Sequence, residues 1–399
     1  MDVEVLLIPV VAATIGFTTN WIAVRMMFYP IRFIGIGRLG WQGVIPSRAA
    51  RMGSISVDKG LAKLGSLDEF YQQLDPARLA EHVVASSRQE VRALVERIVA
   101  REHPQLWADL PPRMREAVFR RVEAHLPELV ETITHDIGEG IDQLMDLKLM
   151  VVRYLEENPE LMNRMFLEVG HKEFRFVVNS GAWFGFLLGL LQMGLWVVWP
   201  NFWVLPAAGL LVGYLTNFLA LRIIFEPVEP RRVGPVTIRG LFLRRQPEVA
   251  EVYARLVTDN ILTLRNLVHE LLTGPKSDRT RLLVERRLRP AIDHAVGLAR
   301  PAVRLAVGSR EYDAIQTSLA TEAVDTTMGS LSDPVFNRER AAVLRHLIAE
   351  RMRDLPSPEF AELLRSAFRE DEWQLIAVGA VLGALAGVGQ VVFIFGGTL

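Results

Sequence analysis

The stretch Gly16-Phe-Thr-Thr-Asn-Trp-Ile-Ala-Val-Arg25-Met-Met-Phe28-Tyr-Pro30 is written twice in this chain. It returns 197 residues later, without a gap, as Gly213-Tyr-Leu-Thr-Asn-Phe-Leu-Ala-Leu-Arg222-Ile-Ile-Phe225-Glu-Pro227. Glycine, threonine, asparagine, alanine, arginine, phenylalanine and proline recur at identical places in both copies. Because a sequence repeat of this kind marks a repeated structural unit, we expect the chain to be a tandem duplication.

The first copy has the composition of a membrane helix that ends at the lipid–water interface. Between Val3 and Val24 the only charged residue is Glu4, and these residues would form a helix of about 33 Å, which suffices to cross a bilayer core. Arg25 ends the apolar run and Pro30 stops the helix. Nothing basic precedes the run, so we expect it to be retained as an anchor and not cleaved as a signal peptide.

Each copy carries a polar motif inside its apolar run, and two interpretations of the motif are open. In one, the amides join helices by hydrogen bonds; in the other, they line a polar path through the membrane. We favour the first, since amides within membranes more often hold helices together than carry substrates. The motif comprises Thr19, Asn20, Arg25, Thr216, Asn217 and Arg222.

Three further membrane helices are predicted at residues 176–199, 202–226 and 373–397, in addition to the first at 1–30. The second and the fourth each carry three glycines at four-residue spacing followed by a glutamine, which is a face of small residues suited to close helix contact. The predicted packing residues are Gly16, Ala23, Gly181, Gly185, Gly189, Gln192, Gly213, Ala220, Gly379, Gly383, Gly387 and Gln390.

Between the spans lie two loops and two polar helical regions. Loops at 31–53 and 227–243 follow the two motif helices, and helical domains are predicted at 54–172 and 244–372 from apolar residues at helical spacing and charges of alternating sign. The first loop is rich in glycine and basic, which predicts contact with the bilayer and its anionic lipid headgroups. The arginines expected at the headgroups are Arg32, Arg38, Arg48 and Arg51.

The predicted fold is therefore an all-α membrane protein with four transmembrane helices in a tandem-duplicated, parallel repeat and two helical cytosolic domains. Basic residues flank the ends of the spans that face these domains, so the positive-inside rule places both domains in the cytoplasm and both termini outside. A parallel repeat has a pseudo-two-fold axis along the membrane normal. We expect that axis to bring Asn20 and Asn217 toward each other.

The composition excludes several kinds of site. The chain has no cysteine, which excludes disulfides and thiolate ligands, and its net charge of −1 gives no reason to expect a nucleic-acid partner. Gly35-x-Gly37-x-x-Gly40 resembles a dinucleotide fingerprint, but it follows a membrane helix where the motif requires a strand. His135, Asp136 and Glu139 are interpreted as part of a solvated acidic face. No catalytic residue, cofactor or metal site is predicted.

The duplicated Gly-x-x-Thr-Asn-x-x-Ala-x-Arg-x-x-Phe-x-Pro pattern, the sequence Gly43-Val-Ile-Pro46-Ser-Arg48 and the terminal glycine series resemble the bacterial integral membrane family catalogued as domain of unknown function 445. The second copy departs from that pattern where Leu243 and Arg244 replace Pro46 and Ser47. The resemblance implies a membrane protein with helical cytosolic portions and supplies no activity.

Three functional classes remain open at this point: a non-enzymatic membrane scaffold, a transporter or channel with a path at Asn20 and Asn217, and an enzyme. We favour the scaffold, because the predicted cytosolic domains are large and polar residues inside the spans are few. The expected partners are the bilayer, an unidentified protein bound by the cytosolic domains and a second copy of the chain. The expected location is the bacterial plasma (inner) membrane.

Overall fold

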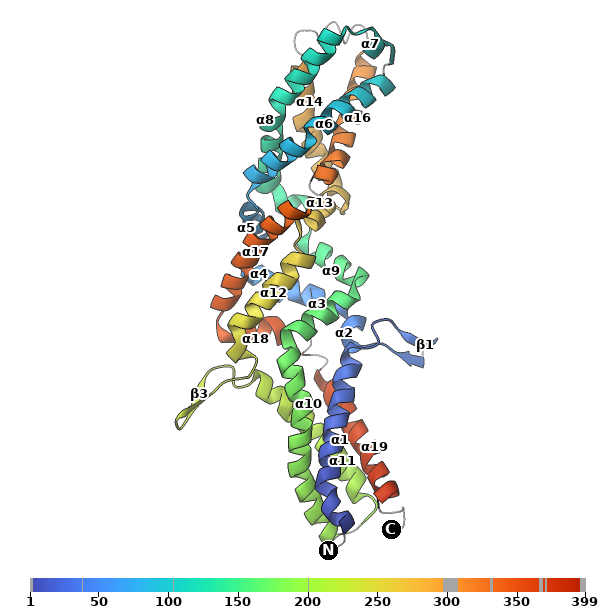
Figure 1. Ribbon diagram of the computed structural model, residues 1–399, viewed down its shortest axis with the longest axis vertical. Helices are drawn as coiled ribbons and strands as arrows, with labels where there is room; N and C mark the ends of the chain where they lie inside the picture. The colour runs from blue at the N-terminus through green and yellow to red at the C-terminus, as the bar shows by residue number, and fades with distance from the viewer. Residues whose placement is uncertain are drawn as a thin grey trace. The chain divides into compact units, whose positions relative to one another are not determined.

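The computed structural model describes residues 3–37, 39–102, 104–199, 201–296, 308–330, 333–365, 369 and 372–394, and almost all of them are helical (Figure 1). The chain forms two compact units. The first unit comprises Met1–Leu64, Val151–Tyr253 and Ala349–Leu399, and the second comprises Gly65–Met150 and Ala254–Ile348. Each unit thus combines segments from both copies of the repeat.

Four helices of the first unit are long and apolar enough to cross a membrane, as the sequence predicts. They are α1 (Val3–Phe28), α10 (Pro159–Val198), α11 (Val204–Phe225) and α19 (Glu372–Ile394). The second helix differs from its predicted range of 176–199, because α10 is a continuous helix of 40 residues. Pro159 stands in the first turn, where proline is tolerated, and no proline interrupts the helix beyond it.

These four helices form a bundle of antiparallel neighbours. Gly16 of α1 lies against Gly181 of α10, whereas Pro9 lies against Gly189, so the two helices run in opposite directions. The same order holds in the second pair, where Gly213 of α11 meets Gly379 of α19. One end of the bundle is closed by an apolar cluster with one residue from each helix, namely Ile8, Trp196, Leu205 and Val391.

Short antiparallel hairpins follow α1 and α11, within the segments 31–53 and 227–243 that the sequence predicts as interfacial loops. The first joins β1 (Ile34–Ile36) to β2 (Leu39–Trp41), and the second joins β3 (Arg231–Val233) to β4 (Val236–Ile238). Gly37 and Gly234 each have a φ of +61°, a left-handed conformation that glycine adopts without strain. The glycine content of these segments therefore reflects a tight turn and not a lack of structure.

The remaining elements of the first unit are helices and helical turns, three of which (α9, α12 and α17) are shared with the second unit. They are α2 (Val44–Ser47), α3 (Ala49–Ser56), the π-helix η1 (Val57–Leu61), α4 (Ala62–Leu64), α9 (Leu147–Glu157), the 3₁₀ turn η2 (Leu243–Arg245), α12 (Gln246–Asn260), α17 (Pro334–Asp354) and α18 (Ser357–Arg365). After the first hairpin, helical structure thus resumes at Val44, ten residues before the predicted start of the helical domain at residue 54.

The second unit is a helical bundle that draws on both polar regions. Its helices are α5 (Leu67–Gln73), α6 (Pro76–Glu102), α7 (Pro104–Asp109), α8 (Pro112–Leu144), α13 (Leu264–Thr273), α14 (Ser277–Val296) and α16 (Ser309–Ser330). α8 packs on α14 and α6 packs on α16, so segments of the predicted domains 54–172 and 244–372 share one core. Each helical pair has an apolar face, and pairing the two faces buries both.

Candidate functional site

The two asparagines of the duplicated motif are fully buried, and each joins two helices. The side-chain amide of Asn20 donates a hydrogen bond to the carbonyl oxygen of Val177 on α10, at 2.9 Å. The amide of Asn217 donates to the carbonyl oxygen of Leu375 on α19, at 3.0 Å. Each amide therefore ties a motif helix to the backbone of its antiparallel neighbour.

The glycines of the facing helix make room for these amides. A Cβ atom on Gly181 would lie 2.7 Å from the amide nitrogen of Asn20, and one on Gly379 would lie 2.1 Å from that of Asn217. Further along, Gly185 lies against the backbone of Ala12, and Gly383 against that of Gly209. Any side chain at these positions would overlap main-chain atoms, so the close approach of the helices depends on glycine.

The other residues of the motif lie in two different environments. The hydroxyls of Thr19 and Thr216 are buried and donate to carbonyl oxygens of their own helices, those of Gly16 and Gly213. The arginines are exposed: the Arg25 guanidinium lies over the rings of Trp21 and Tyr29, and Arg222 pairs with Glu226 at 2.7 Å and lies over Phe218. Ala23 and Ala220 are buried within the bundle.

A hydrogen bond between two glutamines, and not between the asparagines, joins the helix pair α1 and α10 to the helix pair α11 and α19. Gln192 of α10 and Gln390 of α19 are buried, and the amide of Gln192 donates to the side-chain oxygen of Gln390 at 3.4 Å. Among the described residues, Asn20 and Asn217 bond instead to main-chain carbonyls on two different helices. Each motif asparagine thus bonds the backbone of its neighbouring helix, as the interpretation of the motif as a helix-to-helix link allows.

The arginines expected at lipid headgroups do not share one environment. Arg32 is exposed, whereas Arg48 and Arg51 are half-buried, and Arg38 lies outside the described residues. Beside Arg32, the first hairpin carries exposed apolar side chains, with Ile36 exposed to 90% and Leu39 to 84%. Ile34 of the same hairpin is exposed to 68%, so an apolar surface adjoins Arg32.

A buried ion pair, which the sequence reasoning did not identify, links α10 to the 3₁₀ turn η2 that precedes α12. One nitrogen of Arg245, Nη1, donates to both carboxylate oxygens of Glu173 at 2.7 and 2.6 Å, and the side chain of Glu173 is only 6% exposed. The other side of the guanidinium bonds Glu248 at 2.9 Å, and Lys172 also reaches Glu248. Arg245 first, and then Lys172, lower the pKa of Glu248 to about 2. The only sequence signal was that Arg48 recurs as Arg245.

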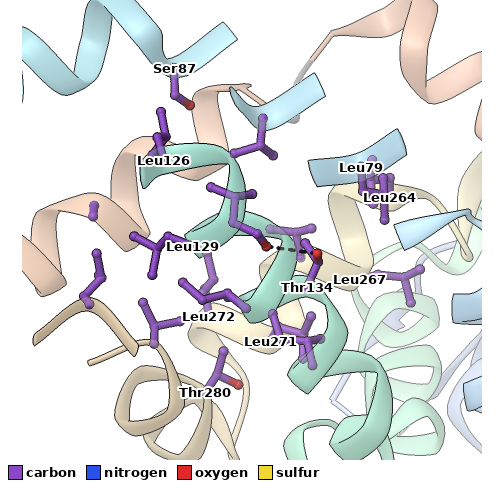
Figure 2. Close-up of a pocket in the computed structure, with 18 of the residues that line it drawn as sticks. Leu79, Ser87, Leu126, Leu129, Thr134, Leu264, Leu267, Leu271, Leu272 and Thr280 are labelled. Carbon is purple, nitrogen blue, oxygen red and sulfur yellow. Dashed lines mark hydrogen bonds between the residues drawn. The ribbon is translucent and has the colours of Figure 1, made fainter. Parts of the chain in front are cut away.

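Two cavities accompany these features. One of about 50 Å³ lies in the first unit, and its lining includes Glu173 and Glu372 but neither motif asparagine. The other, of about 180 Å³, lies in the second unit and is lined mainly by leucine, valine and isoleucine side chains of α6, α8, α13 and α14 (Figure 2). No group of three or more histidine, aspartate or glutamate side chains suited to a metal occurs among the described residues.

Comparison with known proteins finds partial similarity to two cyanobacterial proteins, each described as a UPF0754 membrane protein. One, from Synechococcus sp. strain JA-2-3B'a(2-13), is 38% identical over 80 residues, or 18% of this chain and 20% of the relative. The other, from Synechococcus sp. strain JA-3-3Ab, is 35% identical over 86 residues, or 20% of each. The chain thus matches about a fifth of the length of these relatives. No family model matches the chain, and no solved structure matches it.

Proposed function

We propose that this chain is a multi-pass protein of the bacterial plasma membrane that acts as a non-enzymatic scaffold, with the four-helix bundle as its anchor and the second unit as its binding part. The observation that carries the proposal is the closed polar interior of the bundle. The amides of Asn20 and Asn217 donate hydrogen bonds to neighbouring helices. The backbone of the facing glycines lies so close to these amides that no room for a solute remains beside them. Buried amides of this kind hold membrane helices together.

The proposed arrangement is a parallel tandem repeat with both termini extracytoplasmic and the second unit cytoplasmic. It is supported by the basic residues near the ends of the spans and by the matched asparagines Asn20 and Asn217, which are both fully buried and each donate to a main-chain carbonyl of a neighbouring helix. The names of the two partial relatives support a membrane location. Membership of the family catalogued as domain of unknown function 445, which the sequence resembles, is part of the proposal. The exposed first hairpin with Arg32 is the proposed contact with anionic headgroups.

A transporter is the second candidate, and one specific observation favours it. The side-chain oxygens of Asn20 and Asn217 and the amide nitrogen of Gln390 are buried without a hydrogen-bond partner. Unsatisfied polar atoms inside a membrane bundle are costly and often mark a path for water or ions. The two candidates differ in whether water reaches these residues.

Cysteine accessibility separates the candidates, and the chain has no native cysteine to interfere. Single variants Thr19→Cys and Thr216→Cys, reconstituted in lipid nanodiscs that expose both faces, should resist a water-soluble maleimide because both positions are buried against neighbouring helices. Leu282→Cys, at an exposed position of the second unit, is the reactive control, and Trp21→Cys reports a position on the exposed face of α1. Reaction at both threonine positions at the rate of the Leu282→Cys control would reject the closed anchor and favour transport.

A further inference from the structure

We propose that the first hairpin inserts one of its faces among the lipid acyl chains of the bilayer, in the leaflet that surrounds the Arg25 end of α1. This apolar face comprises Ile34, Ile36, Leu39 and Trp41. The inference rests on the proposed function, because it requires α1 to span a bilayer. It goes beyond a contact of Arg32 with headgroups, since an apolar face gains stability from acyl chains whatever the charge of the lipid.

The register of the hairpin gathers its large apolar side chains on one face. Ile34 lies opposite Trp41 and Ile36 lies opposite Leu39. Residues two apart along a strand point to the same face, as do directly opposite residues, so all four belong together. Their exposed fractions run from 38% for Trp41 to 90% for Ile36, so the protein itself leaves the face uncovered.

The opposite face of the hairpin carries glycine. Gly35 and Gly40 pair with each other there, and the ring of Phe33 lies against Gly40, where a Cβ atom would overlap it. The hairpin therefore has large side chains on one face and none of its own on the other. A group of exposed apolar side chains marks a surface that contacts something other than water.

Both ends of the hairpin are fixed beside the end of α1. The backbone nitrogen of Gly43 donates to the carbonyl oxygen of Pro30 at 2.9 Å. The side-chain amide of Gln42 donates to the carbonyl oxygen of Ile31 at 2.8 Å. The hairpin thus cannot move far from the point at which α1 ends.

That end of α1 lies at the lipid–water interface. The Arg25 guanidinium lies over the exposed rings of Trp21 and Tyr29, and aromatic and basic side chains of this kind gather where membrane helices leave the acyl layer. A strand of three residues covers about 10 Å. Figure 1 shows β1 projecting sideways from the end of α1, so the apolar face stays near this level. The bilayer around α1 is therefore the apolar medium next to it.

The second hairpin has the same backbone plan without the apolar face. Its strands pair in the same register, and its turn has the same left-handed glycine, Gly234. Arg231 stands where the first hairpin has Ile34, and Arg231 and Arg232 are both exposed. Because an arginine is costly among acyl chains, we expect the second hairpin to stay in contact with water. It serves as the matched control.

Nitroxide labels on single cysteines measure the depth of a residue, because molecular oxygen concentrates among acyl chains whereas a nickel chelate stays in water. The full chain is reconstituted in nanodiscs of dioleoylphosphatidylcholine, which has no net charge. The label at Ile36→Cys should collide with oxygen in preference to the chelate, as should a label at Trp21→Cys on the exposed face of α1. Labels at the exposed positions Thr237→Cys, on the second hairpin, and Leu282→Cys, on the second unit, should show the reverse preference.

Two variants at Leu39 test whether the apolar face causes the insertion, each read from the label at Ile36→Cys. Leu39→Glu should lower the population of the inserted hairpin about tenfold, because it removes a side chain, 84% exposed in the protein alone, whose burial among acyl chains stabilises the inserted state. Leu39→Met keeps the apolar character and the volume, so its label should retain the preference for oxygen.

A label that reports water at Ile36→Cys and acyl chains at Trp21→Cys would overturn the insertion and leave the anchor intact. Water at both positions would overturn the anchor as well. Weak collisions of the Ile36→Cys label with both reagents would reject the proposal, because a protein contact, such as a second copy of the chain, would then cover the apolar face. Equal preferences in Leu39→Glu and Leu39→Met would reject it too, because the apolar face would not then place the hairpin in the bilayer.

Discussion

At the scale of single residues, the Arg245 side chain connects two carboxylates of the first unit. Its guanidinium bonds the buried Glu173 with one nitrogen and Glu248 with the other two. Arginine suits this task because its planar fork holds two carboxylates in fixed directions, which a lysine ammonium does not. A buried ion pair adds little net stability, but removing one partner leaves the other charge uncompensated.

We therefore predict that Arg245→Gln destabilises the protein by about 3 kcal/mol at neutral pH, because Glu173 would be left as a buried carboxylate without a counter-ion. The measurement is thermal or denaturant unfolding of the reconstituted protein. The matched control is Arg244→Gln, since Arg244 is exposed and adjacent in sequence. Equal stability of the two variants would show that the pair with Glu173 does not hold α10 against α12.

Part of this effect depends on pH through Glu248. Its folded-state pKa of about 2 lies below its ordinary value of 4.5, so its pairing contributes fully above about pH 4.5 and is lost as the pH falls toward 2. The difference in melting temperature between the native chain and Arg245→Gln should therefore shrink across that window. A difference that grows on acidification would contradict this sign.

At the scale of helices, the spacing of glycines sets how closely the bundle packs. The same α10 carries glycines of two kinds: Gly185 lies against main-chain atoms of α1, whereas Gly194 has open space around it. A Cβ on Gly185 would be 2.6 Å from the carbonyl oxygen of Ala12. Glycine lowers helix propensity at both positions. Only at Gly185 does close packing against α1 require glycine.

The same substitution at these two positions should have opposite effects. Gly194→Ala should raise stability by about 0.5 to 1 kcal/mol through helix propensity, and Gly185→Ala should lower it by about 1 to 3 kcal/mol through overlap with α1. Gly383→Ala should behave like Gly185→Ala, because its Cβ would meet the carbonyl oxygen of Gly209 at 2.2 Å. Thermal unfolding in nanodiscs measures all three. Stabilisation by Gly185→Ala would mean that α1 and α10 do not touch at this level.

The helices themselves could be predicted from sequence because hydropathy and length are local properties. The structure confirms a helical fold with four helices of membrane-spanning length. The continuity of α10 through residues 159–175 was missed, since a charged segment before an apolar run looks like a boundary. The pairing of Glu173 with Arg245 could not be predicted either, because 72 residues separate them and only the fold brings them together. The cavity of the second unit could not be predicted, because apolar residues that line a cavity have the same sequence periodicity as those that fill a core.

At the scale of the whole molecule, neither copy of the repeat forms a unit alone. In the first unit, Glu173 and Gln192 from the first half bond Arg245 and Gln390 from the second. In the second unit, Arg287 pairs with Asp136 at 2.5 Å, and Arg101 with Glu322 at 2.5 Å, again across the two halves. The sequence repeat suggested two helical domains in tandem. In the structure, helices from both of these regions pack their apolar faces together and form one helical bundle, the second unit.

The chain divided between α10 and α11 should therefore fold only when both parts are present. Residues 1–200 and 201–399, expressed separately, each expose the apolar faces that the other half covers, so each should aggregate or stay unfolded in detergent. Expressed together, they should co-purify in equal amounts through a tag on one part, because Trp199 and Asn201, beside the division, are exposed and lie outside the helices, where chain breaks are tolerated.

The contacts across the division also give that experiment a matched pair of variants. Glu173→Ala in the first part should reduce recovery of the second, because it leaves Arg245 without its buried partner. Glu168→Ala on the same helix should not, because the salt bridge of Glu168 to Arg164 lies within the first part. A first part that folds alone, as a monomer or as a dimer of identical copies, and does not recover the second would show that each repeat supplies its own core. Mutual dependence of the two parts would instead show that the duplication is completed only by the contacts between its copies.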